Sequence, residues 1–214
     1  MSEEFIREVD EELKEEKYAR LWKKFGPYVI GLAFSIILLT VGFVLWKNYV
    51  NSSQQSLGDD FSAAVELVQE NDIDAALVAL DKVSESSSDG YVTLAKLKKA
   101  ALLIEKGEIK KGLEIYLDLE KSAVNKSFRD IATLFYVLNS MDTNPPQLLM
   151  KKIDLLIEDS SWSSSALELQ AFLFLKMNDV ESAQKTFKEI VDKKSIPSSL
   201  KRRSQDMINF LKGK

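Results

Sequence analysis

Residues 97–116 read LKKAALLIEKGEIKKGLEIY, and this stretch decides the fold. Apolar residues recur at three- and four-residue spacing on both sides of Lys106-Gly107, which predicts two helices joined by a short turn. The first helix carries Ala100, the second carries Gly112, and Tyr116 lies one turn beyond Gly112. A small residue where two helices cross, followed by a large one a turn later, predicts a closely packed helical hairpin.

The same arrangement recurs along the chain. The small positions of the first helices are Ala64, Ala100, Tyr136 and Ala171, at spacings of 36, 36 and 35 residues. Those of the second helices are Ala76, Gly112, Leu148 and Ala183, at the same spacings. Four residues beyond these lie Leu80, Tyr116, Lys152 and Phe187. A two-helix repeat of this length resembles the tetratricopeptide repeat, whose period is about 34 residues.

This pattern predicts an all-α fold. Hairpins of this kind bury their apolar faces by stacking, so we expect a tetratricopeptide-like α-solenoid of about four hairpins over residues 59–214. The third pair departs most from the pattern, because its crossing positions are large and Lys152 replaces a large apolar residue. Ordinary packing in a helical bundle is the alternative explanation for the small residues.

A last helix follows Pro197 and is expected to cap the solenoid with a polar face. It carries Lys201, Arg202 and Arg203. These three basic residues could instead bind an acidic partner.

Upstream of the repeats, residues 25–46 contain no charged residue. As a helix this run is roughly 33 Å long, enough to cross a hydrocarbon core of about 30 Å. Aromatic rings at both ends, among them Trp22 and Trp46, suit the two membrane interfaces. A buried core helix seldom reaches this length without charge, and a cleaved signal peptide has a shorter apolar region. We therefore predict a single transmembrane signal anchor over residues 25–47.

Basic residues beside this run predict its orientation. The 20 residues before it contain Arg7, Lys14, Lys17, Arg20, Lys23 and Lys24, whereas the 20 after it contain only Lys47. Lys and Arg collect on the cytoplasmic side of a membrane. Arg20, Lys23 and Lys24, nearest the anchor, are thus expected to set a topology with a cytoplasmic N-terminus. The bulk of the chain would then lie outside, which in a bacterium means the periplasm.

Two shorter segments flank the anchor. Residues 1–24 have helical apolar spacing, an acidic beginning and a basic end, which predicts a cytoplasmic amphipathic arm. This arm could dock on a partner, or it could be a solvated extension whose basic end contacts anionic membrane lipid. Residues 48–58 are polar and predict a linker or a frayed helical extension.

Composition excludes several function classes. The chain has no cysteine and no histidine, so thiolate and imidazole metal sites and Cys-His or Ser-His-Asp catalysis are excluded. A net charge of −4 gives no indication of nucleic-acid binding. The carboxylates show no spacing typical of a phosphate or calcium site. We therefore expect no enzymatic activity, no cofactor and no small-molecule substrate.

The N-terminal region also resembles a known family. The segment 5–12 reads FIREVDEE, and the segment 21–28 reads LWKKFGPY. With the order of arm, anchor and repeats, these segments are similar to the ancillary subunit of the bacterial SecYEG translocon, in an alphaproteobacterial form. The resemblance implies an inner-membrane protein with a periplasmic tetratricopeptide-like domain. It also implies translocon subunits, a periplasmic chaperone and secreted chains as partners, and no catalytic residue.

We therefore predict a membrane-anchored interaction protein that associates with the export translocon and assists the handling or folding of secreted proteins. An envelope or cell-division scaffold is the alternative. Helical repeats bind partners through concave faces, and by repeat register this face should draw on the first helix of each pair. Its candidate residues are Phe61, Val65, Leu94, Leu97, Ala101, Thr133, Val137, Phe172 and Leu175.

Overall fold

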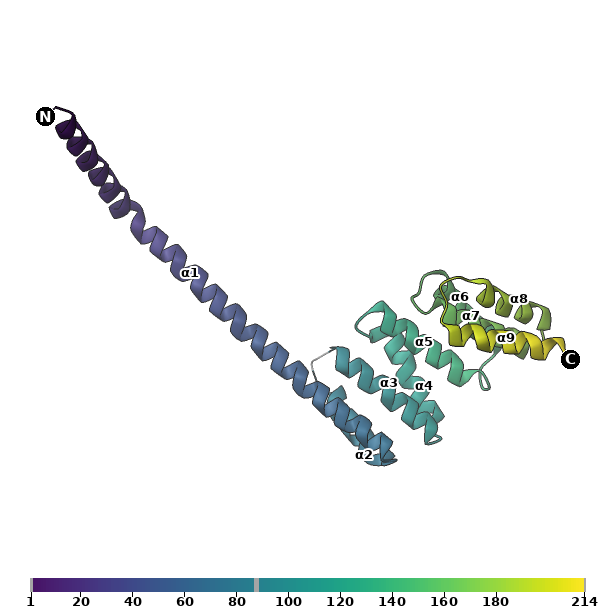
Figure 1. Ribbon diagram of the computed structural model, residues 1–214. Helices are drawn as coiled ribbons and strands as arrows, with labels where there is room; N and C mark the ends of the chain where they lie inside the picture. The colour runs from purple at the N-terminus through teal and green to yellow at the C-terminus, as the bar shows by residue number, and fades with distance from the viewer. Residues whose placement is uncertain (1, 87–88, 214) are drawn as a thin grey trace. The chain divides into compact units, whose positions relative to one another are not determined.

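The computed structural model describes residues 2–86 and 89–213, and within these ranges the secondary structure is entirely α-helical. The side chains of residues 1–17, which carry most of the predicted amphipathic arm, lie outside the described part of the chain. The described helices are α1 (Ser2–Gln69), α2 (Ile73–Ser84), α3 (Asp89–Glu105), α4 (Ile109–Ser122), α5 (Lys126–Ser140), α6 (Pro146–Glu158), α7 (Ser163–Lys176), α8 (Val180–Asp192) and α9 (Ser198–Lys212) (Figure 1). The predicted all-α fold is confirmed.

The chain divides into two compact units, Met1–Gln55 and Ser56–Lys214. The first unit contains most of α1. The large apolar side chains between Val29 and Trp46 are exposed. No residue in the most apolar 18-residue stretch of this helix is buried by the rest of the protein. Among the described helices, α1 alone is long and apolar enough to cross a membrane. α1 is therefore a candidate membrane span.

Two hydroxyl groups within the apolar part of α1 are already hydrogen-bonded. Ser35 Oγ donates to the carbonyl of Gly31 at 2.9 Å, and Thr40 Oγ1 donates to the carbonyl of Ile36 at 2.7 Å. A polar group without a partner is costly in a hydrocarbon environment, and these bonds to the preceding turn remove that cost. The two hydroxyls are thus compatible with a lipid-facing helix.

The polar segment 48–58 is helical throughout, because α1 continues without interruption to Gln69. Its conformation is that of a helical extension rather than of an irregular linker. The boundary between the two units, after Gln55, falls inside this segment.

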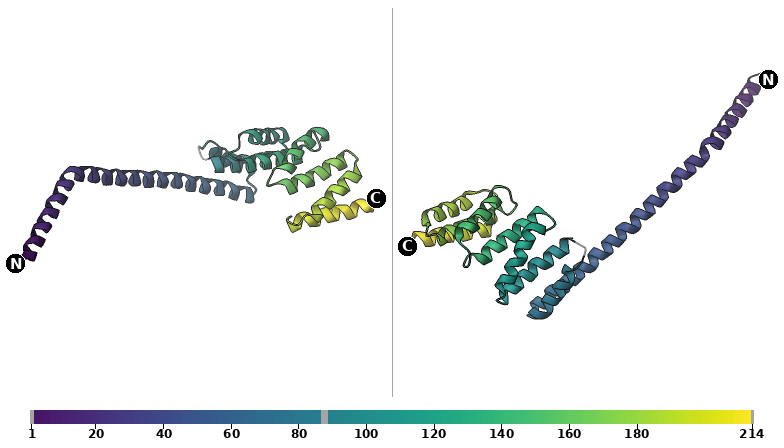
Figure 2. Two further views of the ribbon diagram at one scale, coloured as in Figure 1. Left: turned by 90° about the horizontal axis from the view of Figure 1, so that it is seen from above. Right: turned by 180° about the vertical axis from the view of Figure 1, so that it is seen from behind.

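The second unit is a stack of helical hairpins. The end of α1 shares a buried cluster with α2, in which Ala64 packs with Ala76 and Leu80. α3 pairs with α4, α5 with α6 and α7 with α8, and α9 packs on α8 as the expected cap. Figures 1 and 2 show these helices side by side in chain order. Four clusters of buried apolar residues follow one another along the stack and form its core.

Three of the four hairpins share the same turn. Asn71, Gly107 and Asn178 adopt left-handed backbone conformations, with φ of 63°, 91° and 59°, directly after the first helix of each pair. Asp72 and Asp179 then cap the second helix by accepting hydrogen bonds from the amides of Ala75 and Ser182. The third hairpin has Asn144-Pro145-Pro146 at this place and a different turn.

The structure corrects the predicted register of this third hairpin. Leu148 is exposed, and Lys152 forms an ion pair with Glu120. The buried residues are instead Val137, Leu149 and Ile153, each one position later than predicted. With this shift the repeat spacings become 36, 37 and 34 residues in both helices, because the interval from Gly112 to Val137 is one residue longer than that from Ala76 to Ala100.

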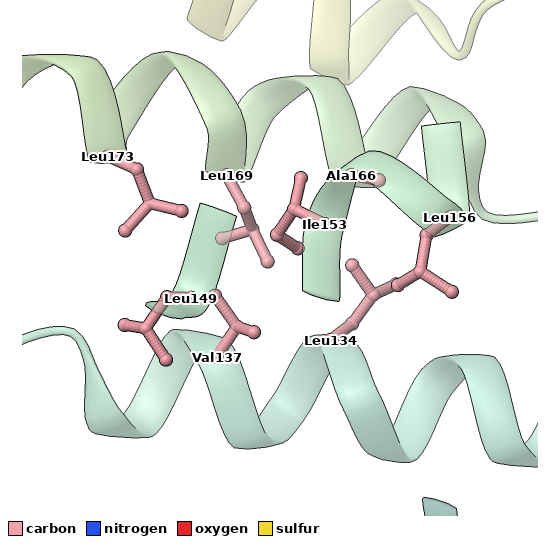
Figure 3. Close-up of a cluster of buried hydrophobic side chains, with 8 residues drawn as sticks. All are labelled: Leu134, Val137, Leu149, Ile153, Leu156, Ala166, Leu169 and Leu173. Atoms are coloured by element: carbon pink, nitrogen blue, oxygen red, sulfur yellow. The ribbon is translucent and has the colours of Figure 1, made fainter. Parts of the chain in front are cut away.

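Side-chain size at the helix crossings explains why the third hairpin differs. A Cβ atom on Gly112 would lie 2.6 Å from the carbonyl oxygen of Ala100, so α3 and α4 approach closely only because Gly112 has no side chain. In the third hairpin, Val137 and Leu149 fill the crossing (Figure 3). These larger residues hold α5 and α6 apart, and this pair packs least extensively of all consecutive pairs from α2 to α9.

Candidate functional site

Two adjoining grooves lie along the first helices of the pairs. The first, which we call the α3–α5 groove, has a volume of about 620 Å³. It is lined by Phe61, Leu94, Leu97, Lys98, Ala101, Asn125, Ser127, Phe128, Ile131, Phe135 and Trp162. The second, the α5–α9 groove, has a volume of about 570 Å³. It is lined by Ile131, Leu134, Phe135, Leu138, Trp162, Ser165, Glu168, Leu169, Phe172, Arg203, Asp206 and Met207.

Ile131, Phe135 and Trp162 line both grooves and join them into one face. Trp162 comes from the turn between α6 and α7. Its indole Nε1–H donates to both the carbonyl and the hydroxyl oxygen of Ser127 at 3.1 Å. These bonds fix a large aromatic ring where the two grooves meet, so the joined face has a defined central wall.

Most of the predicted partner-binding residues lie at this face. Phe61, Leu94, Leu97 and Ala101 line the α3–α5 groove, and Phe172 lines the α5–α9 groove. Val65 and Leu175 are half-buried and belong to neither lining. Five of the nine predicted residues therefore line the two grooves, and their role in partner binding stays a prediction.

The structure corrects the prediction that Thr133 and Val137 lie on the binding face. Val137 is 0% exposed and belongs to the core, and the Thr133 hydroxyl is turned to its own helix, donating to the carbonyl of Arg129 at 3.1 Å. Both were placed by the register that is wrong by one residue. Moving each by one position gives Leu134 and Leu138, which do line the α5–α9 groove.

Sequence reasoning missed the contributions of the start of α5, of the turn between α6 and α7, and of the cap. Phe128, Trp162 and Met207 line the grooves although none belongs to the repeat positions that defined the expected face. Trp162 had a usable signal, because a large aromatic residue in a polar turn is unusual unless it packs against something. Met207 had none, because only the basic residues of α9, and not its apolar ones, were considered for binding a partner.

The charged groups of the two grooves are few, and two of them neutralise each other. Arg203 donates to both carboxylate oxygens of Glu168, at 2.9 and 2.8 Å. This hydrogen bonding and the nearby negative charge raise the pKa of Arg203 above its ordinary value. Lys98, on α3, and Asp206, on α9, form no ion pair with another described residue.

The chemistry of this face favours binding rather than catalysis. Its lining consists mainly of aromatic and aliphatic side chains, which gain free energy when a partner's apolar groups displace water from them. Within residues 18–86 and 90–213, no three His, Cys, Asp or Glu side chains are grouped so that they could hold a metal ion.

Comparison with known proteins agrees with this fold. A family of tetratricopeptide repeat-like domains matches residues 19–203, so the chain belongs to this family. No curated protein matches the chain. Among solved structures, the chain is similar to the TPR-like repeats of a protein described as a kinesin light chain from Podospora anserina. The TM-score is 0.54 at 11% identity, over 73% of this chain and 93% of the other.

These findings identify the class of protein. The likeness to the solved repeats shows the fold alone, because the sequence identity is low. A tetratricopeptide repeat-like domain is typically a scaffold for protein–protein interaction.

Proposed function

We propose that this chain is a non-enzymatic, single-pass membrane protein whose repeat domain binds polypeptides through the joined α3–α5 and α5–α9 grooves. The observation that carries the proposal is the continuity of this apolar face across four pairs and the cap. A soluble domain seldom leaves so many aromatic and aliphatic side chains along one groove unless a partner covers them. The exposed apolar part of α1 would tether the domain to a membrane.

The sequence around the predicted membrane span supports a specific location for the repeat domain. The 20 residues before the apolar run contain six basic residues and the 20 after it contain one, which favours a cytoplasmic N-terminus and a periplasmic repeat domain. The resemblance of the N-terminal region to the ancillary SecYEG subunit favours the neighbourhood of the export translocon in a bacterial inner membrane. Anchoring there raises the local concentration of a weak binder near emerging chains. The partners would then be translocon subunits, periplasmic chaperones and secreted chains.

Site-specific photocrosslinking in membranes tests the binding face. A photoreactive residue at Leu138, in the α5–α9 groove, is expected to capture secreted chains or export subunits. The matched control is Val78, which is 72% exposed on α2 and belongs to neither groove. Equal products from both positions, or capture of division proteins alone, would refute the proposal.

The orientation has its own test. Because the chain has no cysteine, a single introduced thiol reports its own location. Ser199→Cys, on the exposed start of α9, is expected to react with a membrane-impermeant maleimide in spheroplasts, whereas Lys17→Cys reacts only after permeabilisation. The reverse pattern would contradict a periplasmic repeat domain.

A further inference from the structure

The joined grooves offer very few free hydrogen-bond acceptors. The Asn125 side chain accepts from the amide of Phe128, and Ser127 accepts from Trp162. Arg203 and Glu168 are bonded to each other. Of the polar lining, this leaves the Asp206 carboxylate and the Ser165 hydroxyl as free acceptors, while donors remain on Lys98, Asn125, Ser127, Ser165 and Arg203.

This shortage restricts the conformation of a ligand. An extended peptide buried here would lose the hydration of its backbone amides and carbonyls, and each group left without a partner costs about 1–3 kcal/mol. A helix bonds these groups internally and presents only side chains to the grooves. An apolar lining with few free acceptors leaves the backbone amides of an extended ligand unpaired, and it therefore favours a helical ligand.

We infer that the occupant of the joined grooves is an amphipathic α-helix of a partner polypeptide, with one apolar stripe at i, i+3, i+4 and i+7 spacing. This inference rests on the proposed function and names the ligand class of the same site. Neighbouring packed helices lie about 8–10 Å apart, so a face crossing several of them accommodates a helix of roughly 15–25 residues.

The free charges favour one direction for this helix. Lys98 lies on α3, in the lining of the α3–α5 groove, whereas Asp206 lies on α9, in the lining of the other groove. The N-terminus of a helix carries a partial positive charge and its C-terminus a partial negative charge. The ligand's N-terminal end, with basic side chains, is therefore expected over Asp206, and its C-terminal end, with acidic side chains, over Lys98.

Binding of designed peptides to the full chain in nanodiscs tests the conformation. One fluorescent peptide of about 20 residues carries leucine at helical spacing among lysine, glutamate and glutamine; a second has the same composition with leucine at alternate positions, which suits a strand. We expect the first to bind at least tenfold more tightly. Equal or tighter binding of the alternating peptide would overturn the inference.

Variants of the chain locate the binding. Leu138→Asp, at an exposed position of the α5–α9 groove, is expected to weaken binding of the helical peptide at least tenfold, while Val78→Asp leaves it unchanged. Circular dichroism shows whether both variants remain folded, and Phe172→Ser supplies a second groove variant. Unchanged binding in both folded groove variants would exclude this face.

Charge exchange tests the direction. A peptide with basic residues at its N-terminal end and acidic residues at its C-terminal end is expected to bind more tightly than the peptide with these ends exchanged. The double variant Lys98→Glu, Asp206→Lys should invert the preference, and an unchanged preference would contradict the assigned direction.

If crosslinking captures secreted chains but only extended peptides bind, the inference fails and the proposed function stands. If the helical peptide binds but nothing is captured in membranes, the proposed function fails.

Discussion

The guanidinium of Arg203 on α9 donates hydrogen bonds of 2.9 and 2.8 Å to the two carboxylate oxygens of Glu168 on α7. The pair ties the cap to the last hairpin and forms part of the wall of the α5–α9 groove. Glu168 is 14% exposed and Arg203 is 56% exposed, so the carboxylate depends on this partner more than the guanidinium does.

Arg203→Ala is therefore expected to lower the free energy of unfolding by about 1 kcal/mol, at the upper end for a partly exposed pair because the contact is bidentate. Urea unfolding of the repeat domain, followed by the fluorescence of Trp162, measures the change. Arg202→Ala is the control, because this exposed neighbour forms no ion pair with another described residue and should change stability by less than about 0.5 kcal/mol. Equal effects of the two substitutions would contradict the structural role of the pair.

Leu149 and Leu148 test the corrected register directly. Leu149→Ala removes a buried side chain from the core between α5 and α6 and is expected to cost about 2–5 kcal/mol. Leu148→Ala changes a side chain that is 58% exposed and should cost less than about 1 kcal/mol. Chemical denaturation measures the free energy of unfolding of both variants. A larger loss for Leu148→Ala would contradict the corrected register and support the one predicted from the sequence.

The same two leucines show how far the sequence determines the fold. The helical period and the small residues of three hairpins were sufficient to predict the repeat, because Ala and Gly at a crossing constrain the distance between two helices. The third hairpin has no small residue at its crossing, so nothing in its own sequence distinguished Leu148 from Leu149. An extra residue before this hairpin then shifted the expected positions.

The candidate site could be predicted only in part for a related reason. Repeat register located the groove-lining residues of α1, α3 and α7, but the shifted register placed Val137 where Leu138 is. Trp162 and Met207 come from a turn and from the cap, whose positions depend on tertiary packing and not on the repeat. The repeat period of the sequence therefore does not predict which turn and cap residues line the grooves.

Gly112 offers a test of close helix approach. A Cβ atom at this position would lie 2.6 Å from the carbonyl oxygen of Ala100 and 2.5 Å from Cγ1 of Ile104. The Ile104 side chain could move, but the backbone oxygen could not unless α3 and α4 separate. Gly112→Ala is thus expected to lower stability by about 1–3 kcal/mol, despite the better helix propensity of alanine.

Gly90→Ala is the matched control for this substitution. Gly90 lies in the first turn of α3, and an added Cβ would have no neighbour within 4 Å. Its replacement should leave the melting temperature unchanged or raise it, because alanine restricts the unfolded chain. A stabilising effect of Gly112→Ala would show that the two helices are not held at contact distance.

Ser204 on α9 is fully buried, and its hydroxyl has no hydrogen-bond partner among the described residues. Burying an unsatisfied hydroxyl costs free energy, and alanine keeps almost the same volume without it. We expect Ser204→Ala to raise the free energy of unfolding by up to about 1 kcal/mol in thermal or urea unfolding. Ser163→Ala should instead lower it, because Ser163 Oγ donates to the carbonyl of Ile157 at 2.9 Å. Destabilisation by both substitutions would indicate a partner for Ser204.

Tyr116 predicts a pH dependence of stability. Burial raises the pKa of its hydroxyl to about 12, from an ordinary value of 10.0. Below pH 10 the hydroxyl is protonated in both the folded and the unfolded chain and has no effect. Between pH 10 and 12 it ionises in the unfolded chain only, so unfolding releases a proton and stability falls as the pH rises.

Tyr116→Phe lacks this group and keeps the packing against Phe135, whose ring centroid is 5.6 Å away. The wild-type chain should therefore lose about 1 kcal/mol relative to Tyr116→Phe between pH 9 and pH 11, as measured by urea unfolding at each pH. Lysine deprotonation affects both chains alike, so parallel pH profiles would mean that Tyr116 ionises as readily in the folded chain as in the unfolded one.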